Sequence, residues 1–343
     1  MRSVPLIAIR TMEVREIPAP PDPPPGEVTI KITAVGICGS DLHWYQDGRV
    51  GHIQTPFPRI LGHEPAGVVA ALGKDVTTLK LGQRVAIEPA VTCGHCEYCL
   101  TNHHNHCDAL SFHGSISAPG FFQDYLNVPA INCLPVPDSF SLAQITLIEP
   151  LAVIVHVLEL KPIQLGETVA ILGAGPIGLL TATLARLAGA SQIVIGDRLP
   201  HRLRHAREMG FTNLVEMPKQ NFRDAVMDLT RSRGADIVFD AAAAVETINL
   251  GIASARPAGR FVLIGIPTEL NMNIDLHTAM TKEVSIQTIK RSNHNDHQAS
   301  ALIAAGKIPD SFVTHHWPLE KTPEAFQMLT DYSDQVGKVI IQV

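Results

Sequence analysis

The chain of 343 residues has no concentrated block of basic residues. It contains 27 Lys and Arg against 33 Asp and Glu, which gives a formal net charge of −6 at pH 7. Nucleic acids and anionic membrane surfaces are bound by clustered positive charge. These two classes of partner are therefore not expected.

The N-terminus, MRSVPLIAIRTMEVREIP, also lacks the long apolar run and the cleavage site of a secretory signal. Residues 169–185 carry no charge, but they contain Gly173, Gly175, Pro176 and Gly178 and are followed by Arg186. That pattern predicts a buried strand, a turn and a helix rather than a membrane span. The expected location is the cytoplasm.

Neither low-complexity tracts nor internal repeats are present, and the composition is that of a globular protein with 45% hydrophobic residues. A chain of this length is expected to form about two domains. Up to residue 150, short β-type runs alternate with Gly and Pro, which predicts an antiparallel, barrel-like region. The clearest runs are residues 28–35, 66–71 and 84–87, and a Pro-rich segment covers residues 18–26.

From about residue 165, apolar strands alternate with helical segments, which predicts a parallel, doubly wound sheet in an α/β protein. We expect one domain from residues 1–150 together with 288–343, and a second from residues 151–287. A helix near residues 296–305 and a strand at 338–343 complete the first. The strands expected in the second are 167–172, 192–196, 214–216, 236–239 and 260–265, with helices reaching to 189 and 209 after the first two.

The segment Gly173-Ala174-Gly175-Pro176-Ile177-Gly178 follows a predicted strand and opens a predicted helix. Glycines let the backbone approach a pyrophosphate closely, and the start of the helix favours its negative charge. Asp197 stands nineteen residues beyond Gly178, where a carboxylate binds the ribose of NAD and repels the 2′-phosphate of NADP. A surface Asp that caps the next helix is the alternative, and Arg198 is a residue able to bind a 2′-phosphate. The expected cofactor is NAD, with contacts from Gly173, Gly175, Pro176, Ile177, Gly178, Asp197, Arg198 and Arg202.

Four of the six cysteines lie within fifteen residues, as Cys93-x2-Cys96-x2-Cys99-x7-Cys107. Four thiolates at this spacing are typical of a closed, tetrahedral zinc site with a structural role. Free or disulfide-bonded cysteines are the alternative, and disulfides are rare in the cytosol. A second set, Cys38 in GICGSD and His63-Glu64 in LGHE, consists of ordinary zinc ligands. Taken singly, these three residues have common structural explanations.

The order GICGSD, LGHE, four-cysteine segment and GAGPIG resembles the zinc-containing medium-chain dehydrogenase/reductase family over essentially the whole chain. Glu149, in the segment Ile148-Glu149-Pro150-Leu151-Ala152-Val153, is similar to the polyol dehydrogenase branch. The resemblance implies a GroES-like, mainly antiparallel catalytic domain beside a Rossmann domain, with two zinc ions and a homotetrameric assembly. It also implies a catalytic zinc held by Cys38, His63 and Glu64, with Glu149 bound directly or through a water.

The same resemblance implies a proton path through Ser40 and His43, and substrate contacts from Trp44, Phe112 and Arg291. Relatives often have Arg-Tyr where this chain has Arg291-Ser292, and tyrosine where it has Trp44. The expected reaction is NAD-linked oxidation of a secondary alcohol of a polyol to the ketose. The alternatives are a vicinal diol such as 2,3-butanediol, indicated by Phe112-His113-Gly114, and threonine.

Overall fold

The computed structural model describes residues 1–343, and the chain divides into two compact units. Unit 1 comprises Met1–Val153 and Ser292–Val343, and unit 2 comprises Ile154–Arg291. The sequence places the divisions near residues 150 and 288. Among the helices, none is long and apolar enough to cross a membrane.

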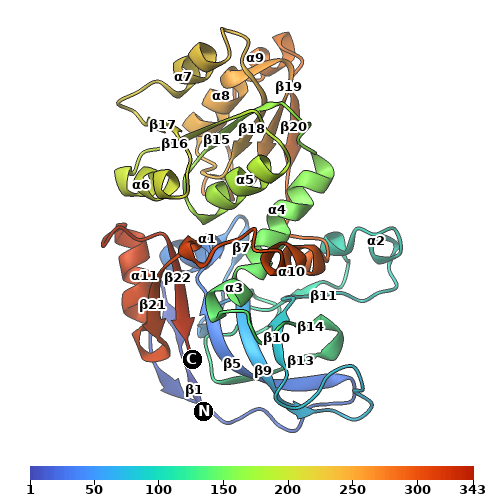
Figure 1. Ribbon diagram of the computed structural model, residues 1–343. Coiled ribbons are helices and arrows are strands. Elements are labelled where there is room, and N and C mark those ends of the chain that lie inside the picture. The colour runs from blue at the N-terminus through green and yellow to red at the C-terminus, as the bar shows by residue number, and fades with distance from the viewer. The chain divides into compact units, whose positions relative to one another are not determined.

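Unit 1 is built on a seven-stranded, mainly antiparallel sheet with the order β14-β10-β9-β5-β22-β21, in which β13 also pairs with β5 (Figure 1). The long central strand β5 explains this arrangement, because its ten residues are mostly buried and pair with three neighbours. The strands are β5 (Glu27–Gly36), β9 (Glu64–Leu72), β10 (Arg84–Ile87), β13 (Tyr125–Pro129), β14 (Cys133–Pro135), β21 (Val313–Pro318) and β22 (Lys338–Gln342).

Short strands and helices surround this sheet. The core contains the fully buried rings of Phe121, Phe122 and Phe326, together with the aliphatic side chains of β5. The helices are α1 (Gly39–Asp47), α2 (Glu97–Leu100), α3 (Leu142–Thr146), α4 (Ile148–Leu160), which continues into unit 2, α10 (Asp296–Ala304) and α11 (Thr322–Asp331). The short strands are β1 (Arg2–Ser3), β2 (Pro5–Ala8), β3 (Thr11–Met12), β4 (Arg15–Glu16), β6 (Arg49–Val50), β7 (Ile53–Gln54), β8 (Arg59–Ile60), β11 (Ala90–Val91) and β12 (Ser111–Phe112).

Unit 2 is a six-stranded parallel sheet with the order β17-β16-β15-β18-β19-β20. Consecutive strands move outward from β15 first in one direction and then in the other, as in a doubly wound fold. The predicted α/β class is therefore confirmed. The strands are β15 (Thr168–Leu172), β16 (Gln192–Asp197), β17 (Asn213–Glu216), β18 (Ala235–Asp240), β19 (Ala255–Leu263) and β20 (Ser285–Thr288).

Helices cover both faces of this sheet: α5 and α6 lie on one, and α7, α8 and α9 on the other (Figure 1). Buried Val, Ile and Phe side chains, including Phe222 and Phe261, fill the core between the sheet and the helices α7, α8 and α9. Such near-continuous apolar strands are expected where both faces of a sheet are covered. The helices are α5 (Pro176–Leu187), α6 (Pro200–Glu208), α7 (Phe222–Leu229), α8 (Val245–Ser254) and α9 (Leu276–Thr281).

Strand β19 differs from its predicted range, since it begins at Ala255 rather than at residue 260 and ends at Leu263. Pro257 and Gly259 interrupt the apolar pattern, and the register with β18 shifts across this segment. Ala258 adopts a positive φ of 55° there, and its N–H donates to the Lys282 carbonyl at 2.7 Å. The irregular first half of β19 has no alternating or apolar pattern, so the sequence predicts only the regular half that begins at Arg260.

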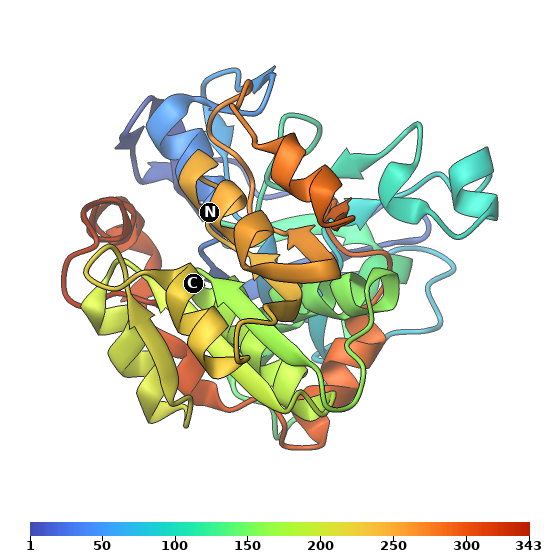
Figure 2. The same ribbon diagram turned by 90° about the horizontal axis from the view of Figure 1, so that it is seen from above.

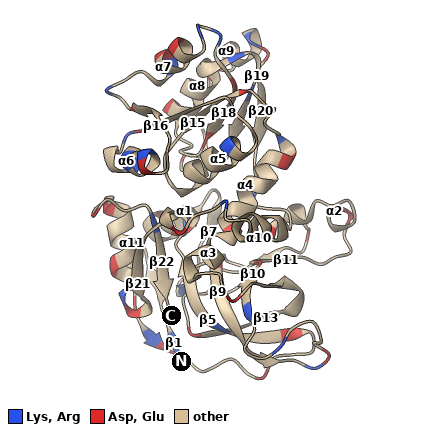
Figure 3. Cartoon of the chain, in the orientation of Figure 1, with Lys and Arg blue, Asp and Glu red and all other residues tan.

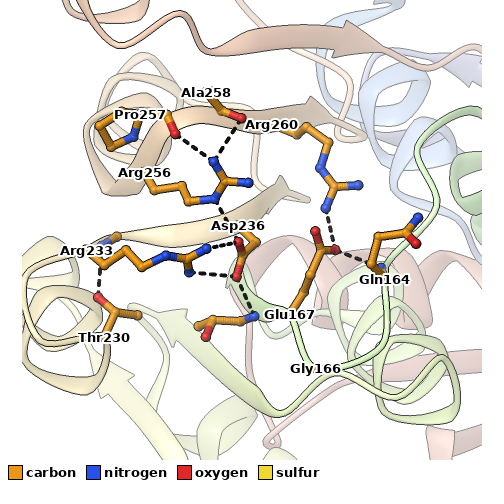
Figure 4. A network of polar contacts seen from close by, with 12 residues as sticks. Gln164, Gly166, Glu167, Thr230, Arg233, Asp236, Arg256, Pro257, Ala258 and Arg260 are labelled. Atoms are coloured by element: carbon orange, nitrogen blue, oxygen red, sulfur yellow. Dashed lines mark hydrogen bonds and ion pairs between the residues drawn. The ribbon is translucent and has the colours of Figure 1, made fainter.

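An ion-pair network around the buried Asp236 joins the amino ends of three strands of unit 2 (Figure 4). Asp236 accepts hydrogen bonds from the Thr168 N–H at 2.9 Å, from Arg233 at 2.6 Å and from Arg256 at 2.7 Å. Burial raises the pKa of Asp236, but these three donors outweigh it and hold the pKa well below its usual range. The ionised carboxylate therefore stabilises this edge of the sheet.

We expect Asp236→Asn to lower the free energy of unfolding by about 2 kcal/mol at pH 7, as for hydrogen bonds to a charged group. Because the folded pKa is depressed, the stabilisation is present above the unfolded pKa of about 4 and is lost as the pH falls below it. Urea unfolding between pH 7 and pH 3 measures the difference, which should shrink at the acid end. Asp224→Asn, at an exposed surface pair, is the control. Equal stability of Asp236→Asn and the unmodified protein at pH 7 would contradict the expectation.

Blue and red segments are scattered over both units in Figure 3, and much of the ribbon carries neither colour. No helix or strand in that view carries a continuous row of Lys and Arg.

Candidate active site and dinucleotide turn

Cys38, His63 and Glu64 meet where two neighbouring strands of unit 1 end. Cys38 follows β5 and is the N-cap of α1, while His63 and Glu64 stand at the start of β9. Because Gly36 of β5 pairs with Glu64 of β9, the two motifs lie side by side. One ligand atom from each of the three residues lies within 4.8 Å of the others. The structure thus brings together three residues that are 26 positions apart at most in the sequence.

Asp41, in the first turn of α1, fixes the geometry of this cluster. Its fully buried carboxylate accepts the Cys38 N–H at 3.0 Å and the Gly62 N–H at 3.2 Å. It also lies 3.4 Å from Nδ1 of His63. A hydrogen on Nδ1 that faces a carboxylate leaves Nε2 as the free ligand atom, as is usual for metal-binding histidines.

Ser40 lies on the opposite side of the same imidazole ring. Its Oγ is 3.4 Å from Nε2 of His63. Burial lowers the pKa of His63, but the negative charges of Asp41 and Cys38 outweigh it and raise the pKa. The pocket therefore favours positive charge at this point.

Two further carboxylates give the cluster an excess of acidic groups. Glu64 is buried, and its Oε1 has no hydrogen-bond partner. Glu149, in the first turn of α4, is also buried, and burial raises its pKa to about 7, with the charge of Glu64 acting in the same direction. Glu149 is not part of the set whose ligand atoms lie within 4.8 Å. The unpartnered carboxylate oxygen of Glu64, the thiol of Cys38 and the imidazole of His63 together form a set of ligands that fits a zinc ion.

The four-cysteine segment forms a lobe that projects from the rest of unit 1, around α2 (Figures 1 and 2). The ligand atoms of Cys93, Cys96, Cys99 and Cys107 lie within 4.8 Å of one another, and the sulfurs of Cys93 and Cys99 are 3.9 Å apart. All six cysteines of the chain are free thiols. The arrangement fits a closed, four-coordinate metal better than a pair of disulfides.

Backbone N–H groups point toward sulfur in this lobe. The Cys96 N–H donates to Sγ of Cys93 at 3.4 Å, and the Cys93 N–H donates to Sγ of Cys107 at 3.3 Å. Hydrogen bonds from the backbone of Asp108 and Cys99 lower the pKa of the Cys96 thiol to about 6. Such donors stabilise the thiolate form, which is the form that binds metal.

In unit 2, the glycine-rich turn connects β15 to α5. Gly173 has a φ of 100°, and Gly175 is the N-cap of α5, with Pro176 at its first position. A Cβ on Gly178 would overlap the Gly173 carbonyl oxygen, so the turn closes only with glycine there. A Cβ on Gly175 would meet only the Arg202 guanidinium, at 3.5 Å. The backbone of this turn is therefore open to a ligand. Ile177 lies in the first turn of α5.

Asp197 ends β16 beside this turn. Its carboxylate accepts the Ala174 N–H at 2.7 Å and the Leu199 N–H at 2.8 Å, and Arg202 lies 3.8 Å from it. These contacts hold the carboxylate against the turn, where it fits the ribose of a dinucleotide. Arg198, the next residue, is exposed.

The remaining predicted residues lie in different surroundings. The Phe112 ring centroid is 5.4 Å from that of His63, beside the cluster. His43 is 3.6 Å from Asp47, one turn further along α1. Trp44 packs into the hydrophobic core of unit 1, so packing alone accounts for its aromatic side chain. Arg291 is the last residue of unit 2 and has a φ of 56°.

The sequence reasoning missed two residues of the cluster, Asp41 and Lys338. Asp41 is part of the GICGSD motif, three residues after Cys38, which is the spacing of a helix-capping carboxylate. Lys338 is the only charged residue of the apolar strand β22, and it is buried with its Nζ against Glu64. A single charged residue in an otherwise apolar strand indicates a buried charge that needs a partner, and this feature is visible in the sequence.

Both units match known family models. Residues 24–138 match the alcohol dehydrogenase GroES-like domain, and residues 176–305 match the zinc-binding dehydrogenase domain. The chain is 34% identical to the sorbitol dehydrogenase of Bacillus subtilis, over 97% of this chain and 94% of that protein. It is 36% identical to a probable D-xylulose reductase A of Aspergillus clavatus, over 88% of this chain and 86% of that protein.

A solved structure agrees with these relatives. The L-idonate 5-dehydrogenase of Escherichia coli superimposes with a TM-score of 0.91 at 30% identity, covering 100% of this chain and 98% of that one. Matches over both units, at this identity and coverage, establish the relationship for the full length. The chain belongs to the zinc-containing medium-chain dehydrogenase/reductase family, in its polyol dehydrogenase-like branch.

Proposed function

We propose that the protein is a zinc-dependent, NAD-linked polyol dehydrogenase that oxidises a secondary alcohol of a sugar alcohol to the ketose. The observation that carries the proposal is the buried cluster of Cys38, His63 and Glu64, whose ligand atoms lie within 4.8 Å of one another. Glu149 stands nearby in place of a further thiolate. Relatives named for sorbitol and D-xylulose support the substrate class.

Cys38, His63 and Glu64 would hold the catalytic zinc, with Glu149 as an additional ligand or as a partner of a bound water. When bound, zinc lowers the pKa of a hydroxyl that it polarises, and NAD accepts a hydride at its nicotinamide ring. The contribution of Asp41 is to keep the His63 ring in one orientation and one tautomer.

Ser40 would take the proton of the substrate hydroxyl. Its Oγ lies 3.4 Å from Nε2 of His63, and the residue belongs to the first turn of α1. A hydroxyl both accepts and donates, so Ser40 can pass that proton onward. His43, oriented by Asp47 on the next turn, is the proposed next acceptor.

Gly173, Gly175 and Gly178, with the start of α5, would bind the pyrophosphate of NAD, and Asp197 the adenosine ribose. Nη1 of Arg202 lies 3.8 Å from that carboxylate and 3.5 Å from the position that a Cβ on Gly175 would take. The four-cysteine lobe would hold a second, structural zinc. The homotetramer and the cytoplasmic location stay predictions.

Asp197→Ala is expected to narrow the preference for NAD over NADP by about tenfold or more. The change removes a carboxylate that binds the ribose hydroxyls and repels a 2′-phosphate, and tenfold corresponds to about 1.4 kcal/mol. The ratio of kcat/KM for the two cofactors is the measurement. Asp224→Ala, on the surface of the same unit, should leave that ratio unchanged. Equal use of both cofactors by the unmodified protein would show that Asp197 does not set the preference.

The substrate class is tested by NADH formation with a panel of alcohols at equal concentration. We expect xylitol or sorbitol to give the highest kcat/KM. Preference for 2,3-butanediol would move the assignment to short vicinal diols, and preference for threonine to an amino-acid dehydrogenase. If simple monohydric alcohols exceed every polyol and diol, the polyol proposal is wrong.

A further inference from the structure

Lys338 is a charged residue that the fold buries completely. It begins β22, and only 2% of its side chain is exposed. Its Nζ donates to the Ile37 carbonyl at 3.0 Å and forms an ion pair with Oε2 of Glu64. Burial of an ammonium group costs several kcal/mol unless its charge is paired and its hydrogens are bonded. A role in the adjacent cluster accounts for its presence there.

Three strands create the space for this ion pair. Strand β5 lies between β9, which carries Glu64, and β22, which carries Lys338. Gly36 of β5 pairs with Glu64 on one side and with Ile340 on the other. A Cβ on Gly36 would overlap Oε2 of Glu64 and lie 3.1 Å from Cε of Lys338. The two side chains therefore meet directly over a glycine.

The ion pair uses only one oxygen of the Glu64 carboxylate. The other oxygen, Oε1, is buried and has no hydrogen-bond partner in the protein. Glu64 also supplies one of the three ligand atoms of the cluster with Cys38 and His63. Lys338 thus holds the carboxylate through Oε2 and leaves Oε1 for a metal.

The charges of the site give Lys338 a second effect. The thiolate of Cys38 and the carboxylates of Asp41, Glu64 and Glu149 would together carry four negative charges, against the two positive charges of zinc. The ammonium group of Lys338 adds a third positive charge and so reduces the excess of negative charge. In a buried site of low dielectric constant, such an excess is costly.

We propose that Lys338 is a positioning residue of the catalytic metal site, which orients Glu64 through Oε2 and reduces the excess of negative charge there. The proposal rests on the function assigned to Cys38, His63 and Glu64. It assigns no contact with substrate or NAD to Lys338. Removal of the ammonium group should therefore weaken zinc binding at this site and leave the four-cysteine site unaffected.

The test is release of zinc from the full-length, zinc-loaded protein into increasing concentrations of a chelator. For Lys338→Met, we expect affinity at the catalytic site to fall about 10- to 100-fold, as for other residues that support metal ligands. Lys338→Gln also removes the positive charge but keeps a hydrogen-bond donor for the Ile37 carbonyl, and should weaken the same site. Zinc in the four-cysteine lobe is the internal reference, since its release should not change.

Lys282→Met is the control, because Nζ of Lys282 also donates to backbone carbonyls, those of Ala253 and Ala255, at 2.7 and 3.0 Å. That variant should lose stability without loss of zinc. Unchanged zinc affinity at the catalytic site in Lys338→Met overturns the proposal, as does equal weakening of both zinc sites. If Lys338→Met does not fold, Lys338→Gln decides by the same criteria. Absence of zinc-dependent polyol oxidation in the unmodified protein would instead contradict the proposed function.

Discussion

Glu149→Ala is expected to lower the rate of polyol oxidation about 100-fold or more, with little change in the affinity for NAD. Residues that bind or support a metal typically contribute 10- to 100-fold to activity, and Glu149 would do so beside the reacting hydroxyl. The dinucleotide turn from Gly173 to Gly178 lies in unit 2 and is left intact. The measurement is kcat with the best polyol, together with a direct titration of NAD binding.

A matched control exists on the same helix. Glu159 also lies on α4, but its side chain is exposed, so Glu159→Ala should keep near-normal turnover. Full activity and full zinc content in Glu149→Ala would remove this residue from the proposed site. A parallel loss of NAD affinity would show that the change acts through the fold rather than through the metal.

Cys96→Ser is expected to remove one of two zinc ions and to destabilise the protein. Four thiolates hold the proposed structural zinc, and binding of such an ion contributes on the order of 10 kcal/mol to folding in small zinc domains. The loss should fall mainly on thermal stability and assembly, because the catalytic set of Cys38, His63 and Glu64 is separate. Zinc content and the thermal unfolding midpoint measure both effects.

Cys133→Ser is the control for this change. Cys133 is buried and belongs to neither cluster of possible metal ligands. The control should therefore keep two zinc ions per chain. One zinc or none in the fully loaded, unmodified protein would contradict the two-site account.

Local patterns explain how much of the molecule is predictable from its sequence. The range of β10 is predicted without error, and β5, β9, β15 and β16 are found within a few residues, because apolar runs end at Gly, Pro or charged residues. The four cysteines are also a local pattern, since all of them lie between residues 93 and 107. The glycine-rich turn is recognisable because strand, turn and helix are consecutive.

Contacts between distant segments are less accessible to sequence reasoning. Lys338 and Glu64 are 274 residues apart and meet only because β22 and β9 flank β5. The sequence alone gives no reason to pair them. The family resemblance alone suggests that Trp44 contacts substrate. Its side chain packs into the core of unit 1, and the substrate contact stays a prediction.

The central claim is that zinc held at Cys38, His63 and Glu64 is required for NAD-linked oxidation of a polyol. The most direct measurement is the rate of NADH formation from xylitol or sorbitol by protein stripped of metal, as zinc is returned in known amounts. The account predicts negligible activity without metal and full recovery as the catalytic site fills, with no recovery in Cys38→Ala. Undiminished polyol oxidation by the metal-free protein, or by Cys38→Ala, would contradict it.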